Sequence, residues 1–198
     1  LFLSSDHGAA EVPAMLKEEG FEVGRYYSDS INLILQKVMA KHYLSEIVMG
    51  VYNDQIYLNH EAIQKFNYDM KLMADHVRGA LEDVQGIKRI WTWDEINASQ
   101  DEYAIAIRKG YHPMRSGDLF IQFLPGWLEH WSQGTTHGSG YAYDTHVPIV
   151  LYGQGIQSGK SYRRVSITDI APSLSVILKV AYPSACSGNP LSECLKPD

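Results

Sequence analysis

Cysteine is rare in this sequence, and no long apolar run occurs. Only Cys186 and Cys194 are found among the 198 residues, and their spacing is not that of a CxxC motif, which argues against a zinc ribbon or a thioredoxin-like site. The two thiols either form a small disulfide, which would indicate an oxidising compartment, or stay unpaired. No apolar stretch approaches the ~18 residues that a membrane helix needs, so we expect no membrane partner.

Positive charge is also scarce. The chain has 17 Lys and Arg residues against 23 Asp and Glu residues, which gives a formal net charge of −6. The densest basic segment, "SYRRVS", is too short to form a nucleic-acid surface, so we expect no nucleic-acid partner. Hydrophobic residues make up 45% of the chain and charged residues 20%, a composition typical of a globular domain with a core rather than of a disordered or fibrous protein.

An initiator methionine, a signal peptide and a transit peptide are all absent from the sequence. The chain instead opens inside an apolar strand pattern, "LFLSS". An apolar strand needs neighbours that cover it, so we expect Leu1 to be a processed terminus or the edge of a fragment. No repeat or linker divides the chain, and we expect residues 1–198 to form one domain.

Strand and helix patterns alternate along the chain and predict an α/β layered fold. "EIVMGVYNDQIYLN" reads as a β-hairpin around Asn53-Asp54, because this type of pair tolerates a tight turn. An apolar stripe from Ile63 to Leu81 at steps of three and four residues predicts a helical stretch. The other expected strands are 1–5, 87–93, 117–125 and 147–153; the other expected helices are 12–19, one capped by Ser28 or Ser30, 101–109 and one capped by Thr168; a loop is expected over 131–143.

Asp6 and His7 stand where the first predicted strand ends. Ligands of open α/β sheets gather at the carboxyl ends of strands, and a carboxylate and an imidazole suit zinc or a similar divalent ion. Gly8 permits the turn that would let both adjacent side chains reach one ion. The alternative is a loop pair that only bonds to the backbone.

Three further residues are candidates in the glycine-rich region and just after it. His137 lies in "GTTHGSGY", where glycines on both sides let the backbone wrap closely around the imidazole. Asp144 could orient a ligating histidine as an outer partner. His146 stands beside a predicted buried strand, where a structural role is the simpler reading. No GxSxG elbow and no P-loop are present, so neither esterase-type nor nucleotide-cradling chemistry is supported.

An ordered set of segments resembles the alkaline phosphatase superfamily, and within it the C-terminal part of the bacterial phosphate-irrepressible alkaline phosphatases and of the nucleotide pyrophosphatase/phosphodiesterases. The segments are "SSDHGAAEVP", "NDQIYLN", "GYHPMRSGDLFIQFLPGW", "GTTHGSGYAYDTHVPIVLYGQGI", "VSITDIAPSLSVIL" and "GNPL". They span nearly the whole chain. The resemblance implies the α/β/α fold of that superfamily, C-terminal portion only, with a small inserted hairpin and helix region.

The resemblance also implies a two-zinc site that hydrolyses small phosphate esters. Asp6 and His7 match the Asp-His pair that binds one metal, and His137 matches a ligand of the other. The nucleophile, a Thr or Ser that forms a covalent phospho-enzyme, and the remaining ligands would lie upstream of Leu1. The missing N-terminal portion is therefore an implied partner. The fragment alone is expected to be inactive, and the parent enzyme is expected to be periplasmic or otherwise exported.

Three alternatives stay open at this point. The same scaffold also carries phosphodiesterases and sulfatases, whose substrate choice depends on groups that this chain does not contain. The chain could instead be a metal-free binding domain that kept the scaffold, or a structural domain in which "DHG" is incidental. Convergence of Asp6, His7 and His137 would favour the metal site over both.

Overall fold

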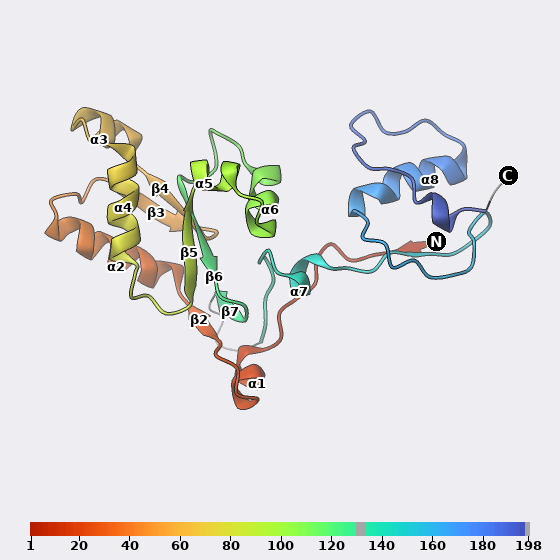
Figure 1. Cartoon of the computed structure of the whole chain (residues 1–198), viewed down its shortest axis with the longest axis horizontal. Helices are drawn as coiled ribbons and strands as arrows, with labels where there is room; N and C mark the ends of the chain where they lie inside the picture. The colour runs from red at the N-terminus through yellow and green to blue at the C-terminus, as the bar shows by residue number, and fades with distance from the viewer. Residues whose placement is uncertain (130–133, 197–198) are drawn as a thin grey trace. The chain divides into compact units, whose positions relative to one another are not determined.

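A computed structural model describes residues 1–129 and 134–196. The chain divides into two compact units, of which the first combines Leu1–Asp6 with His146–Asp198 and the second comprises His7–Thr145. Figure 1 labels the elements of each unit. The expectation of one domain over residues 1–198 stays a prediction.

The second unit is built on a four-stranded antiparallel sheet with the order β3-β4-β6-β5. The central strand β6 is fully buried along its length, with all five residues inside. This agrees with its sequence, "LFIQF", which has apolar residues on both faces and so suits a strand covered on both sides. The strands are β3 (Val48–Tyr52), β4 (Gln55–Leu58), β5 (Ile87–Thr92) and β6 (Leu119–Phe123).

Helices cover both faces of this sheet (Figure 1). Leu119, Ile121 and Phe123 of β6 join the larger apolar core, to which α2 (Ser28–Lys41) and α4 (Met70–Ala80) contribute their buried faces. Phe120 points to the opposite face because side chains alternate along a strand. It packs in a second core with residues of α5 (Trp93–Ala98) and α6 (Glu102–Gly110). The second unit thus has three layers, helix, sheet and helix.

The predicted hairpin is present. Strands β3 and β4 pair in antiparallel register, with Tyr52 opposite Gln55. The two residues between them, Asn53 and Asp54, have φ values of 48° and 58°. Two consecutive positive φ values are the signature of a type I′ turn, whose twist matches that of the flanking strands.

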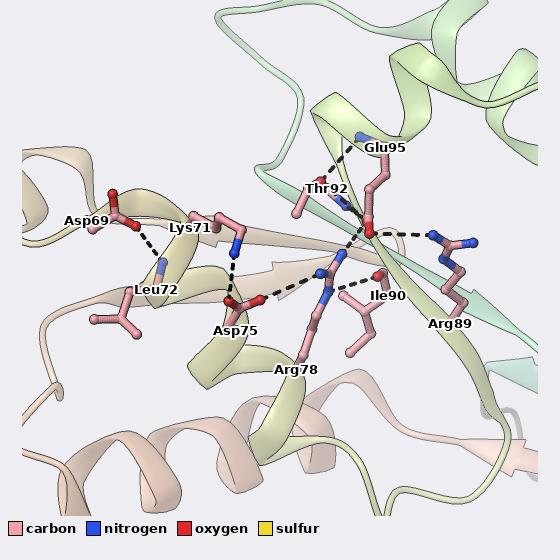
Figure 2. Close-up of polar contacts among 9 residues, drawn as sticks. All are labelled: Asp69, Lys71, Leu72, Asp75, Arg78, Arg89, Ile90, Thr92 and Glu95. Atoms are coloured by element: carbon pink, nitrogen blue, oxygen red, sulfur yellow. Dashed lines mark hydrogen bonds and ion pairs between the residues drawn. The ribbon is translucent and has the colours of Figure 1, made fainter.

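The predicted helical stretch is two helices rather than one. Asn67 adopts a φ of 52° and ends α3 (His60–Lys65). The side chain of Asp69 then accepts a hydrogen bond from the backbone N–H of Leu72 at 2.8 Å and caps α4 (Figure 2). Asn tolerates the left-handed region, and Asp is a preferred N-cap, so local polar chemistry interrupts the apolar stripe.

Smaller elements complete the second unit. Strands β2 and β7 form a parallel pair that the sequence patterns did not predict. The first three residues of the predicted loop 131–143 lie outside the described residues, and the rest contains no strand or helix until its last two residues. These elements are α1 (Pro13–Glu18), β2 (Gly24–Tyr26), β7 (Trp127–Glu129) and α7 (Ala142–Thr145).

The first unit has a small two-stranded sheet in which β1 (Phe2–Leu3) pairs antiparallel with β8 (Val150–Leu151). Both strands were expected to be buried, but Phe2 is 47% exposed and Val150 is 50% exposed. Two strands of two residues have too few neighbours in the unit to cover their side chains. The chain continues with the 3₁₀ turn η1 (Ile167–Asp169), helix α8 (Ile170–Leu178) and the 3₁₀ turn η2 (Ser192–Cys194).

Two expectations for the first unit need correction or completion. Ser166, rather than Thr168, caps the turn that leads into α8, and it does so in a capping box with Asp169. Cys186 and Cys194 are both free thiols, so the structure favours the unpaired alternative. Within residues 1–129 and 134–196, no helix combines the length and the apolar character needed to cross a bilayer.

Candidate metal and substrate site

The structure brings His7 and His137 into direct contact. Their ring centroids are 3.5 Å apart, and the ring planes are inclined by only 16°. The two residues are 130 positions apart in the sequence and both belong to the second unit. The contact is therefore a product of the fold and not of local sequence.

Backbone hydrogen bonds hold the two segments side by side. The N–H of Gly8 donates to the carbonyl of Asp144 at 2.7 Å, and the N–H of Ala10 donates to the carbonyl of Thr136 at 3.2 Å. A Cβ atom at position 8 would lie only 2.0 Å from the carbonyl oxygen of Tyr143. Only glycine permits this close approach, which places the preceding residue, His7, beside the glycine-rich segment.

The hydrogen bond of His7 indicates which of its ring nitrogens carries the proton. Its Nδ1 lies 2.6 Å from the carbonyl oxygen of Gly8. A carbonyl only accepts hydrogen bonds, so Nδ1 carries the proton and the lone pair of the neutral ring is on Nε2. A histidine that binds a metal through Nε2 is held in this way, with Nδ1–H donating to a carbonyl. The chemistry of His7 therefore fits a metal ligand.

Asp144 is buried, and its side chain binds back to the glycine-rich segment that precedes it. Its Oδ2 accepts hydrogen bonds from the backbone N–H of Ser139 at 2.7 Å and from the Ser139 hydroxyl at 2.6 Å. Its Oδ1 is buried and accepts no hydrogen bond from residues 1–129 or 134–196. A buried carboxylate oxygen of this kind is costly unless a donor or cation satisfies it. The expectation that Asp144 orients a histidine stays a prediction.

Two of the expected site residues belong to the first unit. Asp6 is exposed and accepts a hydrogen bond from the Ser5 hydroxyl at 3.5 Å. His146 is exposed as well. Over the part of the chain that the structure describes, no group of three or more His, Cys, Asp or Glu side chains is arranged to hold a metal ion. The assembled part of the expected site is thus the His7–His137 contact.

A cavity of about 490 Å³ opens beside His137 within the second unit. Its lining includes Asp54 from the β3–β4 turn, Glu129 from the end of β7 and Tyr26 from the end of β2. Loop residues 136–141 form the wall that contains His137. A cavity of this size is in the range of small-molecule sites.

The electrostatics of the cavity centre on Asp54. The hydroxyl of Tyr26 donates to Asp54 Oδ1 at 2.6 Å. Burial, with the added repulsion of Glu129, raises the pKa of Asp54 to about 6 although the Tyr26 hydrogen bond acts in the opposite direction. Burial also raises the pKa of Tyr26 and of Tyr103 well above the ordinary value of tyrosine. At neutral pH the cavity therefore contains an ionised carboxylate beside un-ionised phenols.

Sequence reasoning missed these cavity residues. The pattern of Asn53-Asp54 predicts only a turn, and Tyr26 and Glu129 belong to strands that the sequence patterns do not predict. In the sequence, Asp54 is recognisable only as a residue that favours a tight turn. That its side chain also lines the cavity cannot be inferred from this pattern. No local pattern connects residue 26 with residue 54 or residue 129, because the β2–β7 pairing and the hairpin bring them together.

Comparison with known proteins gives a consistent family. The family model described as "Type I phosphodiesterase / nucleotide pyrophosphatase" matches residues 1–142. Relatives include alkaline phosphatase PafA of Elizabethkingia meningoseptica, which is 31% identical over 198 residues that cover 98% of this chain and 36% of the relative. A calcium-transporting ATPase of Myroides odoratus is 31% identical over 201 residues, with 99% and 37% covered.

A more distant relative and the solved structures agree with this. Alkaline phosphatase PhoV of Synechococcus elongatus is 27% identical over 198 residues, covering 99% of this chain and 36% of that protein. The crystal structure of wild-type PafA superposes with a TM-score of 0.84 at 29% identity, over 98% of this chain and 38% of that one. The chain spans little more than a third of the relatives' length, and the predicted alkaline phosphatase type of fold, present in part, is confirmed.

Proposed function

Because the chain belongs to the type I phosphodiesterase/nucleotide pyrophosphatase family, within the alkaline phosphatase superfamily, we propose that it is part of a metal-dependent phosphoric ester hydrolase. The observation that carries the proposal is the contact of His7 with His137, whose ring centroids are 3.5 Å apart. The known phosphatases among the relatives support the reaction class.

In this proposal Asp6 and His7 bind one zinc ion, and His137 binds the other. An imidazole binds a metal in the plane of its ring, so two nearly parallel rings 3.5 Å apart suit two ions rather than one. Asp144 and His146 are proposed as outer partners that orient these ligands.

The zinc ions, when bound, would supply positive charge that stabilises the attacking and leaving oxygens at the phosphorus. The residues of this chain hold the ligands in position: the Gly8 carbonyl fixes the proton of His7 on Nδ1, and Asp144 fixes the loop that bears His137 through Ser139. The Thr or Ser that forms the covalent phospho-enzyme belongs, in the proposal, to another part of the parent protein.

The isolated chain is proposed to bind zinc weakly and to be inactive. Asp6, His7 and His137 would leave most of both coordination shells open, whereas zinc sites usually have three or four protein ligands. The parent enzyme is proposed to act in the periplasm or another exported location, which is what the resemblance to the alkaline phosphatase superfamily implies.

The test uses the complete parent protein, assayed with p-nitrophenyl phosphate and bis(p-nitrophenyl) phosphate while bound zinc is measured. His7→Ala and His137→Ala should each lower kcat/KM at least about 100-fold, as expected when a group that stabilises the transition state is lost, and should lower the zinc content. His42→Ala, at the exposed C-cap of α2, is the matched control and should change neither.

The outcomes separate the alternatives. Preference for the first compound indicates a phosphate monoesterase, and preference for the second a phosphodiesterase. Zinc-independent turnover, or His7 and His137 variants as active as the His42 control, would overturn the metal site. A parent protein that binds phosphate esters without hydrolysing them would support the non-catalytic binding domain instead.

A further inference from the structure

Six aromatic side chains line the cavity beside His137: Tyr26, Tyr103, Phe120, Phe123, Trp127 and Tyr141. The hydroxyls of the three tyrosines are all engaged with protein acceptors. Tyr26 donates to Asp54 at 2.6 Å, Tyr103 to the Ile121 carbonyl at 3.0 Å and Tyr141 to the Phe123 carbonyl at 2.6 Å. Tyr26 is further fixed by stacking on Phe123 at 3.6 Å. The rings are therefore held in place before any ligand binds.

The charge of the cavity is one-sided. Asp54 and Glu129 are carboxylates, whereas no Lys or Arg is among the described residues that line it. Glu129 Oε1 accepts a hydrogen bond from the Ser28 hydroxyl at 2.6 Å, which holds its side chain near the end of β7. One basic group contacts a lining ring, since Lys88 Nζ lies 5.9 Å from the centroid of Tyr141.

A cavity with this lining repels an anion and attracts a cation. A phosphate group inside it would meet the carboxylates of Asp54 and Glu129 and no Lys or Arg among the described residues that line it. An ammonium group would gain attraction to the carboxylates and to the faces of the aromatic rings. Quaternary ammonium groups are recognised in aromatic cages by the same forces. A ligand with both groups would therefore place its ammonium end inside the cavity and its phosphate outside the cavity, near His137.

We propose that this cavity binds an ammonium group carried by the alcohol portion of the substrate, with Asp54 and Glu129 as its anionic partners. The site would take primary or quaternary ammonium alcohols esterified to phosphate. The assignment of the phosphate to the His137 side of the cavity rests on the proposed function. The binding of the ammonium group rests only on the cavity.

The test measures binding of choline to the 198-residue chain by NMR titration, with 3,3-dimethylbutan-1-ol as the neutral isostere. Choline should bind about tenfold more tightly and should shift the signals of Tyr26 and Trp127. Asp54→Asn keeps an oxygen to accept the Tyr26 hydrogen bond but removes the charge, so it should reduce the preference for choline about five- to tenfold. Asp29→Asn, on exposed α2 surface outside the cavity lining, should leave it unchanged.

Glu129→Gln is the second variant, because Glu129 is exposed and its substitution does not disturb the core. It should also lower the preference for choline. Equal affinity for the two probes, absence of binding up to millimolar concentration, or an equal loss in Asp29→Asn would overturn the proposal.

The complete parent protein separates this proposal from the proposed function. Both hold if phosphocholine is hydrolysed with a kcat/KM about tenfold above that of 3,3-dimethylbutyl phosphate and Asp54→Asn abolishes the difference. The cation subsite stands and the hydrolase proposal falls if choline binds but neither ester is cleaved. The hydrolase proposal stands and the cation subsite falls if both esters are cleaved equally well.

Discussion

Gly8 determines how closely the two histidine-bearing segments approach. Its N–H bonds to the Asp144 carbonyl, and the carbonyl of Tyr143 occupies the space where a Cβ atom would be. The carbonyl of Gly8 is at the same time the acceptor for His7 Nδ1. Gly8 thus fixes both the position of His7 and the ring nitrogen of His7 that carries the proton.

Gly8→Ala should destabilise the chain by about 1–3 kcal/mol, the usual cost of overpacking a closely packed site. The added methyl group would have to displace the backbone at Tyr143, because a rigid carbonyl lies 2.0 Å away. Urea unfolding monitored by circular dichroism measures the change. In the complete protein, zinc content should fall as well.

Gly79→Ala is the matched control. Gly79 lies in α4, is exposed and has nothing within 4 Å of the position that a Cβ would take. The alanine should therefore stabilise the chain by about 0.5–1 kcal/mol through its higher helix propensity. Equal stability effects of the two substitutions would contradict the role given to Gly8.

At the scale of elements, a polar network joins α4 to the β5–α5 junction (Figure 2). Arg78 of α4 pairs with Glu95 and donates from Nε to the carbonyl of Ile90 at 3.2 Å. Glu95 forms a capping box with Thr92, which starts α5 directly after β5. Partial burial acts to raise the pKa of Glu95, but the Thr92 N–H, Arg78 and Arg89 outweigh it and lower the pKa.

Glu95→Ala should destabilise the chain by about 1–2 kcal/mol, since it removes a capping box and two ion pairs. A lowered pKa in the folded state means that the stabilisation is complete above the ordinary pKa of Glu and is lost as pH falls. The difference from wild type should therefore shrink between about pH 5 and pH 3. Thermal unfolding across this range measures it.

Lys71→Ala is the control for this network. Lys71 is 87% exposed and lies 3.7 Å from Asp75 one helical turn away. Exposed pairs of this kind contribute about 0.5 kcal/mol or less. The prediction would be wrong if Glu95→Ala lowered the free energy of unfolding no more than Lys71→Ala does. It would also be wrong if the loss did not depend on pH.

The elements of the second unit were largely predictable, because their patterns are local. The hairpin, α1, α2, β5, α6 and β6 follow from apolar periodicity and turn residues. The α5 helix is not predicted although Thr92-x-x-Glu95 is a capping-box pattern, because the apolar strand pattern over 87–93 extends into its first residue, Trp93. β2 and β7 were missed because strands of three residues carry too little periodicity to stand out.

The candidate site was predictable only in part. His7 and His137 were identified through a resemblance, and their contact depends on long-range pairing that no local pattern encodes. The aromatic and acidic cavity was not foreseen, because its residues serve as turn and strand residues when each is read in its own segment. The assignment of Asp6 and His7 to one metal ion and of His137 to the other stays a prediction.

At the scale of the whole molecule, the two units differ in how well they are packed. The second unit contains both apolar cores. The first unit has a sheet of two very short strands. Several apolar side chains at β1, at β8 and around the C-terminal end of α8 are exposed, among them Leu1, Phe2, Leu3, Val150, Leu178 and Val180. Isolated pairs of strands are marginally stable at best.

Hydrogen exchange of the 198-residue chain should therefore be fast in the first unit and slow in the second. Amides of β6 and of the buried face of α4 should require global unfolding, whereas those of β1 and β8 should open locally at a much lower free energy. Exchange followed by mass spectrometry measures both. Uniform protection of the two units would contradict the difference in packing.

The composition of the first unit from both ends of the chain has a consequence for biosynthesis. The backbone N–H of Tyr152 donates to the carbonyl of Leu1, 151 residues earlier in the chain, at 2.9 Å. The second unit lies wholly between these partners, so on the ribosome it can fold while β1 still awaits β8. Strand β1 is thus synthesised before the whole second unit but pairs only after it, and its apolar side chains are uncovered by β8 for that interval.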